Sequence, residues 1–135
     1  MNLSQQDIID WLATLGIGPN LAVNVPVYAG PYVPEMPDVQ AVVTAIAGLG
    51  ESLQGAADTA GFQLRVQGRQ LSAGSPEDIA FTADRLILTA PLPALVGGVW
   101  LQPVVRSGGR PAPLPSRDPG DRVIYTATYL TTFVY

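Results

Sequence analysis

Residues 122–135, RVIYTATYLTTFVY, limit most narrowly what this chain can fold into. β-Branched and aromatic residues dominate the run, as is typical of the pleated surface of a sheet. The run is longer than an ordinary strand of about five or six residues. A segment rich in proline and glycine, residues 107–121, comes directly before it and predicts a stiff loop. A stiff loop that leads into a long strand favours a protein that assembles with other subunits over an enzyme.

Two segments carry the apolar spacing and the end signals of helices. Over residues 4–15, Ser4 is a candidate N-cap and Asp7 follows three residues later, as in a capping box. Over residues 75–90, Ser75 has the same role. One apolar stripe runs along each segment at helical spacing, so we expect both helices to pack on a core.

Strands account for most of the remaining sequence. We expect them over residues 21–29, 38–47, 62–67, 99–106 and 122–135. Pro26 and Pro103 lack a backbone N–H, which favours an edge position or a bulge for the strands that hold them. The glycine-rich residues 48–61 predict a long flexible loop. Helices set apart from a run of adjacent strands indicate an α+β fold, with one domain over residues 1–135 and a mostly antiparallel sheet flanked by two helices.

The scarcity of charge excludes several functions. Charged residues make up 13% of the chain, against about 25% in an average protein. Lysine, histidine and cysteine are absent, so thiolate nucleophiles, imidazole bases and zinc sites of the CxxC kind are excluded. With a net charge of −4, the chain also lacks the cluster of cations that duplex DNA requires. We expect no metal, no cofactor and surfaces that a partner covers; the alternative is a weakly charged monomer.

The remaining sequence signals favour neither catalysis nor export. Asp118 and Asp121 flank a Pro-Gly turn, and Glu77 and Asp78 begin a helix, so each acidic pair has a structural explanation. The chain has no GxxxxGK[ST] pattern for a nucleotide. It has no apolar run long enough for a membrane span, and its first residues do not resemble a secretory signal. We therefore expect no enzyme, no membrane partner and no export.

Arginines and aromatic side chains are the candidate contact residues. A guanidinium group binds a carboxylate through two parallel hydrogen bonds, so each exposed arginine is a candidate for an ion pair across subunits. The alternative for any one of them is a solvated side chain. Trp11 and Trp100 are candidates for the core or for a half-buried interface, and Phe133 and Tyr135 either pack in the core or contact a neighbour.

Three segments together resemble a known family. PYVPEMPD at residues 31–38 is similar to a proline-rich turn before a strand that ends in glycine. FQLRVQGR at 62–69 resembles an alternating strand before a helix, and GGRPAPLPSRDPGDRVIYTATYLTTFVY at 108–135 resembles a Gly-x-Pro loop, an Asp-rich turn and a closing strand. In this order they resemble the tail-terminator, or tail-completion, proteins of long-tailed bacteriophages, often labelled minor capsid proteins. The chain departs from the pattern in its few charges and in Gln67, where a second arginine is expected.

The resemblance implies a structural virion protein. Such proteins form a ring, commonly of six copies, at the head-proximal end of the tail tube, where the ring ends tube polymerisation and docks to the head–tail connector. The partners would be further copies of the chain, the tail-tube protein and the connector or stopper protein, with DNA only passing through the lumen.

The resemblance also implies a location, and together with the arginine and aromatic signals it leads to a set of expected contact residues. The protein would assemble in the host bacterial cytoplasm and lie in the tail or neck of the virion. The residues expected at subunit contacts are Arg65, Arg69, Arg110, Leu114, Arg117, Asp118, Arg122, Phe133 and Tyr135. The open alternatives are a tail-tube subunit, a head–tail stopper or a small ligand-binding module.

Overall fold

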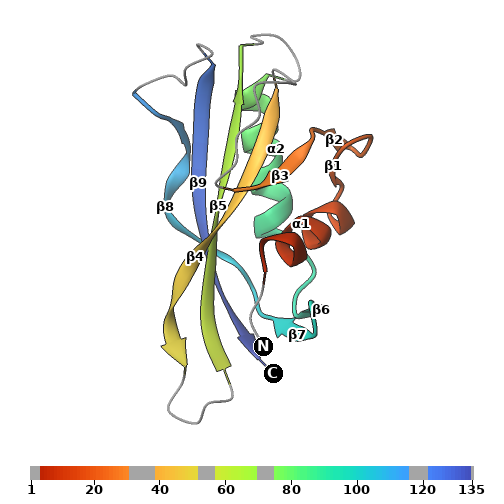
Figure 1. Ribbon diagram of the computed structural model, residues 1–135, viewed down its shortest axis with the longest axis vertical. Helices are drawn as coiled ribbons and strands as arrows, with labels where there is room; N and C mark the ends of the chain where they lie inside the picture. Colours follow the sequence, from red (N-terminus) through yellow and green to blue (C-terminus); the bar gives the residue numbers. More distant parts are fainter. Residues whose placement is uncertain (1–3, 31–38, 52–56, 70–74, 116–121, 135) are drawn as a thin grey trace.

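A long twisted sheet with two helices on one face forms the framework of the chain (Figure 1). The computed structural model describes residues 4–30, 39–51, 57–69, 75–115 and 122–134. The elements are α1 (Gln5–Thr14), β1 (Ile17–Gly18), β2 (Val23–Asn24), β3 (Val27–Ala29), β4 (Gln40–Glu51), β5 (Ala57–Gly68), α2 (Pro76–Leu88), β6 (Ala94–Val96), β7 (Val99–Leu101), β8 (Val105–Pro113) and β9 (Val123–Val134).

The main sheet has the order β3-β4-β5-β9-β7-β6, and β8 also pairs with β9. β3 and β4 run parallel, and the other pairs of this sheet are antiparallel. β9 pairs with β5 along its whole length, while β7 and β8 share its other edge. The expected α+β fold, with a mostly antiparallel sheet and two helices, is therefore confirmed, as is the long final strand.

Both helices begin where their capping residues predict. The Ser4 hydroxyl accepts a hydrogen bond from the Asp7 N–H, and the Asp7 carboxylate accepts one from the Ser4 N–H, each at 3.0 Å. This reciprocal pair is a complete capping box. At α2 the Ser75 hydroxyl accepts from the Asp78 N–H at 3.3 Å, with Pro76 at the first helical position.

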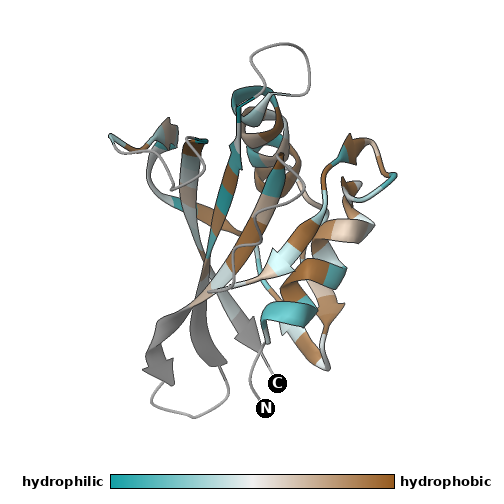
Figure 2. Cartoon of the chain, turned by 45° about the horizontal axis from the view of Figure 1, so that its top comes forward, coloured by the Kyte–Doolittle hydropathy of each residue, from teal (hydrophilic) through white to brown (hydrophobic). Residues whose placement is uncertain are grey.

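The core lies between the helices and one face of the sheet. Trp11 of α1 contacts Phe62 edge-on, with ring centroids 6.3 Å apart, and Phe62 stacks on Tyr129 at 5.1 Å. These three rings are at most 5% exposed, and they join α1 to β5 and β9. Hydrophobic and hydrophilic residues alternate along the central strands, as Figure 2 shows, because only one face of the sheet meets the helices.

The loop expected over residues 48–61 is wrong. β4 continues to Glu51 and β5 begins at Ala57, so most of this segment is a β-hairpin, with residues 52–56 outside the described part. The register shifts between Ile46 and Gly50, which marks a bulge. Glycine and alanine are poor strand formers in isolation, but pairing with β9 along the whole of β5 overrides that preference.

The loop expected over residues 107–121 is also wrong in its first half. β8 continues to Pro113 along β9, with a register shift between Ser107 and Ala112. Proline and glycine are tolerated there because β8 is an edge strand, where a missing N–H breaks no ladder. Residues 116–121 lie outside the described part.

The prolines break the two strands that contain them. The strand expected over residues 21–29 is divided into β2 and β3 around Pro26, whose carbonyl accepts from the Ala41 N–H at 2.9 Å. The strand expected over residues 99–106 is divided into β7 and β8 around Pro103. The sequence interpretation missed β1 and β6, which are two and three residues long.

Candidate assembly surfaces

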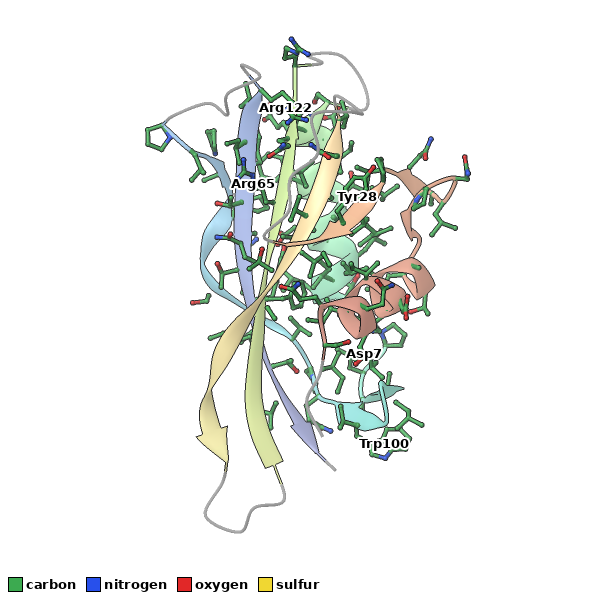
Figure 3. The ribbon with its side chains drawn as sticks, viewed as in Figure 1. Asp7, Tyr28, Arg65, Trp100 and Arg122 are labelled. Carbon is green, nitrogen blue, oxygen red and sulfur yellow. The ribbon has the colours of Figure 1, made fainter. Side chains whose placement is uncertain are left out.

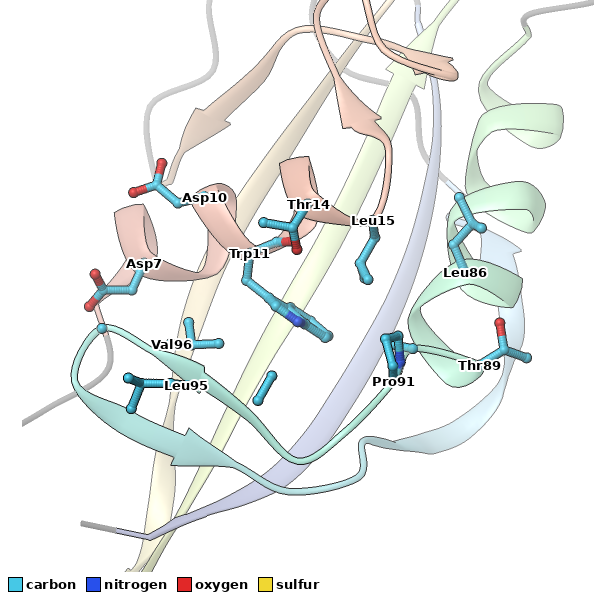
Figure 4. A pocket seen from close by; sticks show the side chains of 13 residues that line it. Asp7, Asp10, Trp11, Thr14, Leu15, Leu86, Thr89, Pro91, Leu95 and Val96 are labelled. Carbon is cyan, nitrogen blue, oxygen red and sulfur yellow. The ribbon is translucent and has the colours of Figure 1, made fainter.

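An open groove of about 660 Å³ lies between α1, the end of α2 and β6 (Figure 4). Trp11 lies at its centre, and apolar side chains from all three elements surround it. The described residues that line it are Asp7, Asp10, Trp11, Thr14, Leu15, Leu86, Thr89, Ala90, Pro91, Ala94, Leu95, Val96 and Gly97. Two of these are carboxylates and none is a cation, so the groove combines an apolar floor with an acidic end.

The acidic end depends on a tight turn between β6 and β7. Gly97 and Gly98 connect the paired residues Val96 and Val99, with φ of 57° and 83°. Positive φ at both positions is what a two-residue type I′ turn requires. A Cβ on Gly97 would lie 2.6 Å from the Asp7 carboxylate. Glycine therefore lets this turn approach the first turn of α1 and close that end of the groove.

Two large hydrophobic side chains are exposed beside the groove. Leu95 and Trp100 are directly opposite each other across β6 and β7, and they are 61% and 47% exposed. Figure 3 shows Trp100 at the lower right, pointing away from the body of the molecule. Tryptophan is rarely left this exposed without a reason, so the pair marks a candidate contact surface.

β8 forms a second candidate surface, on the sheet edge away from α1 (Figure 1). Val105 and Leu114, at its two ends, are 60% and 40% exposed. Between them lies the exposed Arg110, within the segment where the register shifts. No hydrogen bond or ion pair within the described part of the chain engages its guanidinium group. This edge is therefore apolar with one cation available.

A buried polar cluster fastens β8 and β9 to α2. The Asp84 carboxylate accepts from the Tyr129 hydroxyl at 2.8 Å and from the Arg106 guanidinium at 2.6 Å. Burial first, and then this hydrogen bond, raise the pKa of the Tyr129 hydroxyl well above its ordinary value of 10.0. The sequence interpretation missed the cluster. The sequence feature that could have revealed it is a charged residue on the apolar stripe of a helix. Asp84 lies four residues after Ala80 and three before Ile87, both of which are buried.

Two of the expected contact arginines lie on the sheet face that points away from the helices (Figure 3). The Arg65 Nε donates to the Gln67 side-chain carbonyl at 2.6 Å. Arg122, just before β9, is 4% exposed, and Gln67 is fully buried. Arg122 and Gln67 therefore belong to the interior of a single copy, while Arg65 is half-buried.

The other expected contact residues are scattered. Arg69 is exposed just after β5, and the N–H of the exposed Leu114 donates to the Ile124 carbonyl at 2.8 Å. Phe133 is a β9 residue whose backbone pairs with Asp58 and Leu101. Arg117, Asp118 and Tyr135 lie outside the described residues. The structure brings Arg110 and Leu114 to one edge, and the part that any of these residues has in a subunit contact stays a prediction.

The described part of the chain has neither the side-chain cluster of a metal site nor a membrane-spanning helix. Its residues contain no group of three or more acidic, histidine or cysteine side chains placed to hold a metal ion. None of its helices is long and apolar enough to cross a membrane.

Comparison with known proteins finds a likeness of fold but no matching sequence family. No family model matches the chain, and no curated protein matches its sequence. Among solved structures, the fold is similar to a chain from the virion of a native gene transfer agent (GTA) particle. The TM-score is 0.60 at 14% identity, over 96% of this chain and 90% of that one. This likeness shows a shared fold.

A second solved structure, whose name states no function, covers 98% of this chain and 96% of its own at 17% identity. Its TM-score of 0.47 is too low to support an argument.

Proposed function

We propose that this chain is a structural protein of a phage-like virion, and that it forms a ring at the head-proximal end of the tail tube. The observation that carries the proposal is the likeness to a chain of the gene transfer agent virion, which extends over 96% of this chain. The likeness is at the level of fold, and it agrees with the resemblance of residues 31–38, 62–69 and 108–135 to tail-terminator proteins.

Two features of the molecule support a binding role over catalysis. Charge is scarce, at 13% of residues, and the large side chains of Leu95, Trp100 and Val105 lie exposed. Exposed apolar area of this kind marks surfaces that are covered in an assembly. In this role the protein transforms no substrate and needs no cofactor. Its partners are further copies, the tail-tube protein and the head–tail connector or stopper, while DNA passes through the lumen.

Deletion of the gene in the particle-producing cell tests this role, with electron microscopy as the measurement. A ring that ends polymerisation and docks to the connector leaves, when removed, tubes of uncontrolled length and heads without tails. A tail-tube subunit would instead leave no tubes, and a head–tail stopper would leave tubes of normal length beside unjoined heads. Normal joined particles would contradict every virion role.

A further inference from the structure

The groove beside α1 and the β8 edge are complementary surfaces on opposite sides of the same molecule. The groove has an apolar floor and two carboxylates, Asp7 and Asp10. The β8 edge offers exposed apolar side chains and Arg110. Figures 1 and 2 both place α1 and β8 on opposite sides of the central strands, so β8 cannot reach the groove of its own copy.

We propose that the groove of one copy receives the β8 edge of a second copy, with Arg110 at the Asp7–Asp10 end and Leu114 against the apolar floor. The inference rests on the proposed ring, and it identifies the contact between neighbouring copies in that ring. A contact between two different surfaces repeats from copy to copy, and it closes into a ring when the rotation between copies divides a full turn.

The distribution of exposed hydrophobic residues supports this pairing. Six large hydrophobic side chains are exposed among the described residues, and four of them lie on the two surfaces: Leu95 and Trp100 beside the groove, and Val105 and Leu114 on β8. The three most exposed of the six belong to this set. A head-to-tail contact would cover both groups at once, which a two-fold contact through either surface alone would not.

The charges are matched as well as the apolar surfaces. The carboxylates at the acidic end have no cation beside them among the described lining residues. Asp10 is exposed and accepts a hydrogen bond from the Gln6 amide at 2.9 Å, which leaves its second oxygen available. An arginine brought to this end gains a charge-assisted hydrogen bond, and a like charge placed there repels.

Cross-linking in solution tests the contact directly, because the chain has no cysteine of its own. A variant with both Leu95→Cys and Leu114→Cys is treated with a bifunctional maleimide. Both positions are exposed, so the variant should keep its fold, which circular dichroism checks. We expect a ladder of covalent oligomers that ends at the size of the ring, whereas either single variant stops at a dimer.

A matched control uses Leu21→Cys with Leu95→Cys. Leu21 is also an exposed leucine, at 38%, but it lies outside both surfaces. A ladder no stronger than that of this control, in a protein that native mass spectrometry shows as a ring, would overturn the groove contact and leave the ring. A protein that stays monomeric and unlinked at high concentration overturns the contact, while the virion role is judged separately from the deletion phenotype.

Charge reversal supplies the second readout. Asp10→Arg is preferred to a change of Asp7, because the Asp7 carboxylate caps α1. Asp10→Arg and Arg110→Asp should each weaken assembly several-fold, and the double variant should recover most of the loss. Single variants that assemble like the parent protein, or a double variant as weak as the sum of the two, would overturn the pairing.

Discussion

At the residue scale, Asp84 is the side chain on which three elements depend. It lies on α2 and accepts hydrogen bonds from Arg106 of β8 and Tyr129 of β9. A second buried nitrogen of the same arginine, Nε, has no hydrogen-bond partner in the described part of the chain. Burying a guanidinium group costs free energy, and the ion pair with the Asp84 carboxylate offsets part of that cost. The same ion pair fixes β8 against α2.

Tyr129→Phe should lower the free energy of unfolding by about 1–2 kcal/mol, because it removes one buried hydrogen bond and leaves the stacked ring in place. Urea unfolding at neutral pH measures the change. Thr128→Ser is a suitable control. Thr128 is the residue before Tyr129 in β9, so its side chain lies on the opposite face of the strand and takes no part in the cluster. An equal loss in both variants would contradict the role of the cluster.

The same tyrosine gives the protein a predicted sensitivity to alkali. Burial raises the pKa of Tyr129 above 10.0 in the folded protein, so the unfolded chain releases this proton first as the pH rises. The free energy of unfolding should stay level with respect to this group below pH 10 and fall above it, by at most about 1.4 kcal/mol per pH unit.

Urea unfolding between neutral pH and pH 11 measures that slope, and Tyr129→Phe should reduce it. Burial and the neighbouring Glu77 also raise the pKa of Tyr125, so the variant keeps part of the slope. A parent protein whose stability is unchanged above pH 10 would contradict the prediction.

At the element scale, the turn between β6 and β7 closes one end of the groove. Gly97 and Gly108 both have positive φ, at 57° and 95°, but their surroundings differ. A Cβ on Gly97 would meet the Asp7 carboxylate at 2.6 Å, whereas a Cβ on Gly108 would meet nothing within 4 Å. The pair therefore separates backbone strain from steric clash.

Gly108→Ala should cost about 1–2 kcal/mol of unfolding free energy through backbone strain alone. Gly97→Ala should cost about 1–3 kcal/mol more, because the new methyl group displaces the carboxylate that caps α1. Thermal unfolding of the two variants compares them. Equal losses in the two variants would mean that a methyl group on Gly97 does not displace the Asp7 carboxylate, and would contradict the prediction.

Helices and the final strand could be predicted from the sequence because their signals are local. Ser4 with Asp7, and Ser75 with Pro76, fix where each helix begins, and the run of β-branched and aromatic residues fixes β9. The distal halves of β4 and β5 could not be predicted, because alanine and glycine form strands there only through pairing, of β4 with β5 and of β5 with β9. β6 and β7 did have a local signal, the Gly97–Gly98 pair between two apolar runs.

At the scale of the whole molecule, the candidate surfaces arise from distant parts of the chain. Residues of α1, the end of α2 and β6 meet to form the groove, and no motif in the sequence links them. Sequence reasoning selected Arg110 and Leu114 as contact residues, but it also selected Arg122, which the fold buries. The difference arises because exposure depends on which face of the sheet is covered, and residue type does not determine that.

Trp100→Ser should separate assembly from folding. The side chain is 47% exposed in a single copy, so about half of its apolar surface is already covered there; its loss should lower the free energy of unfolding by about 1–2 kcal/mol, and the variant should still fold. Its loss should weaken assembly, measured by sedimentation, because the apolar area that a neighbour covers is removed. Leu21→Ser is the control, an exposed leucine outside both surfaces whose loss should leave assembly unchanged.

The number of copies per particle tests the central claim most directly. Quantitative mass spectrometry of purified particles, against a tail protein of known number, gives this figure. A single ring predicts a small fixed number of copies that does not change with tail length. Absence of the chain from particles, or a copy number that rises in proportion to tail length, would contradict the account.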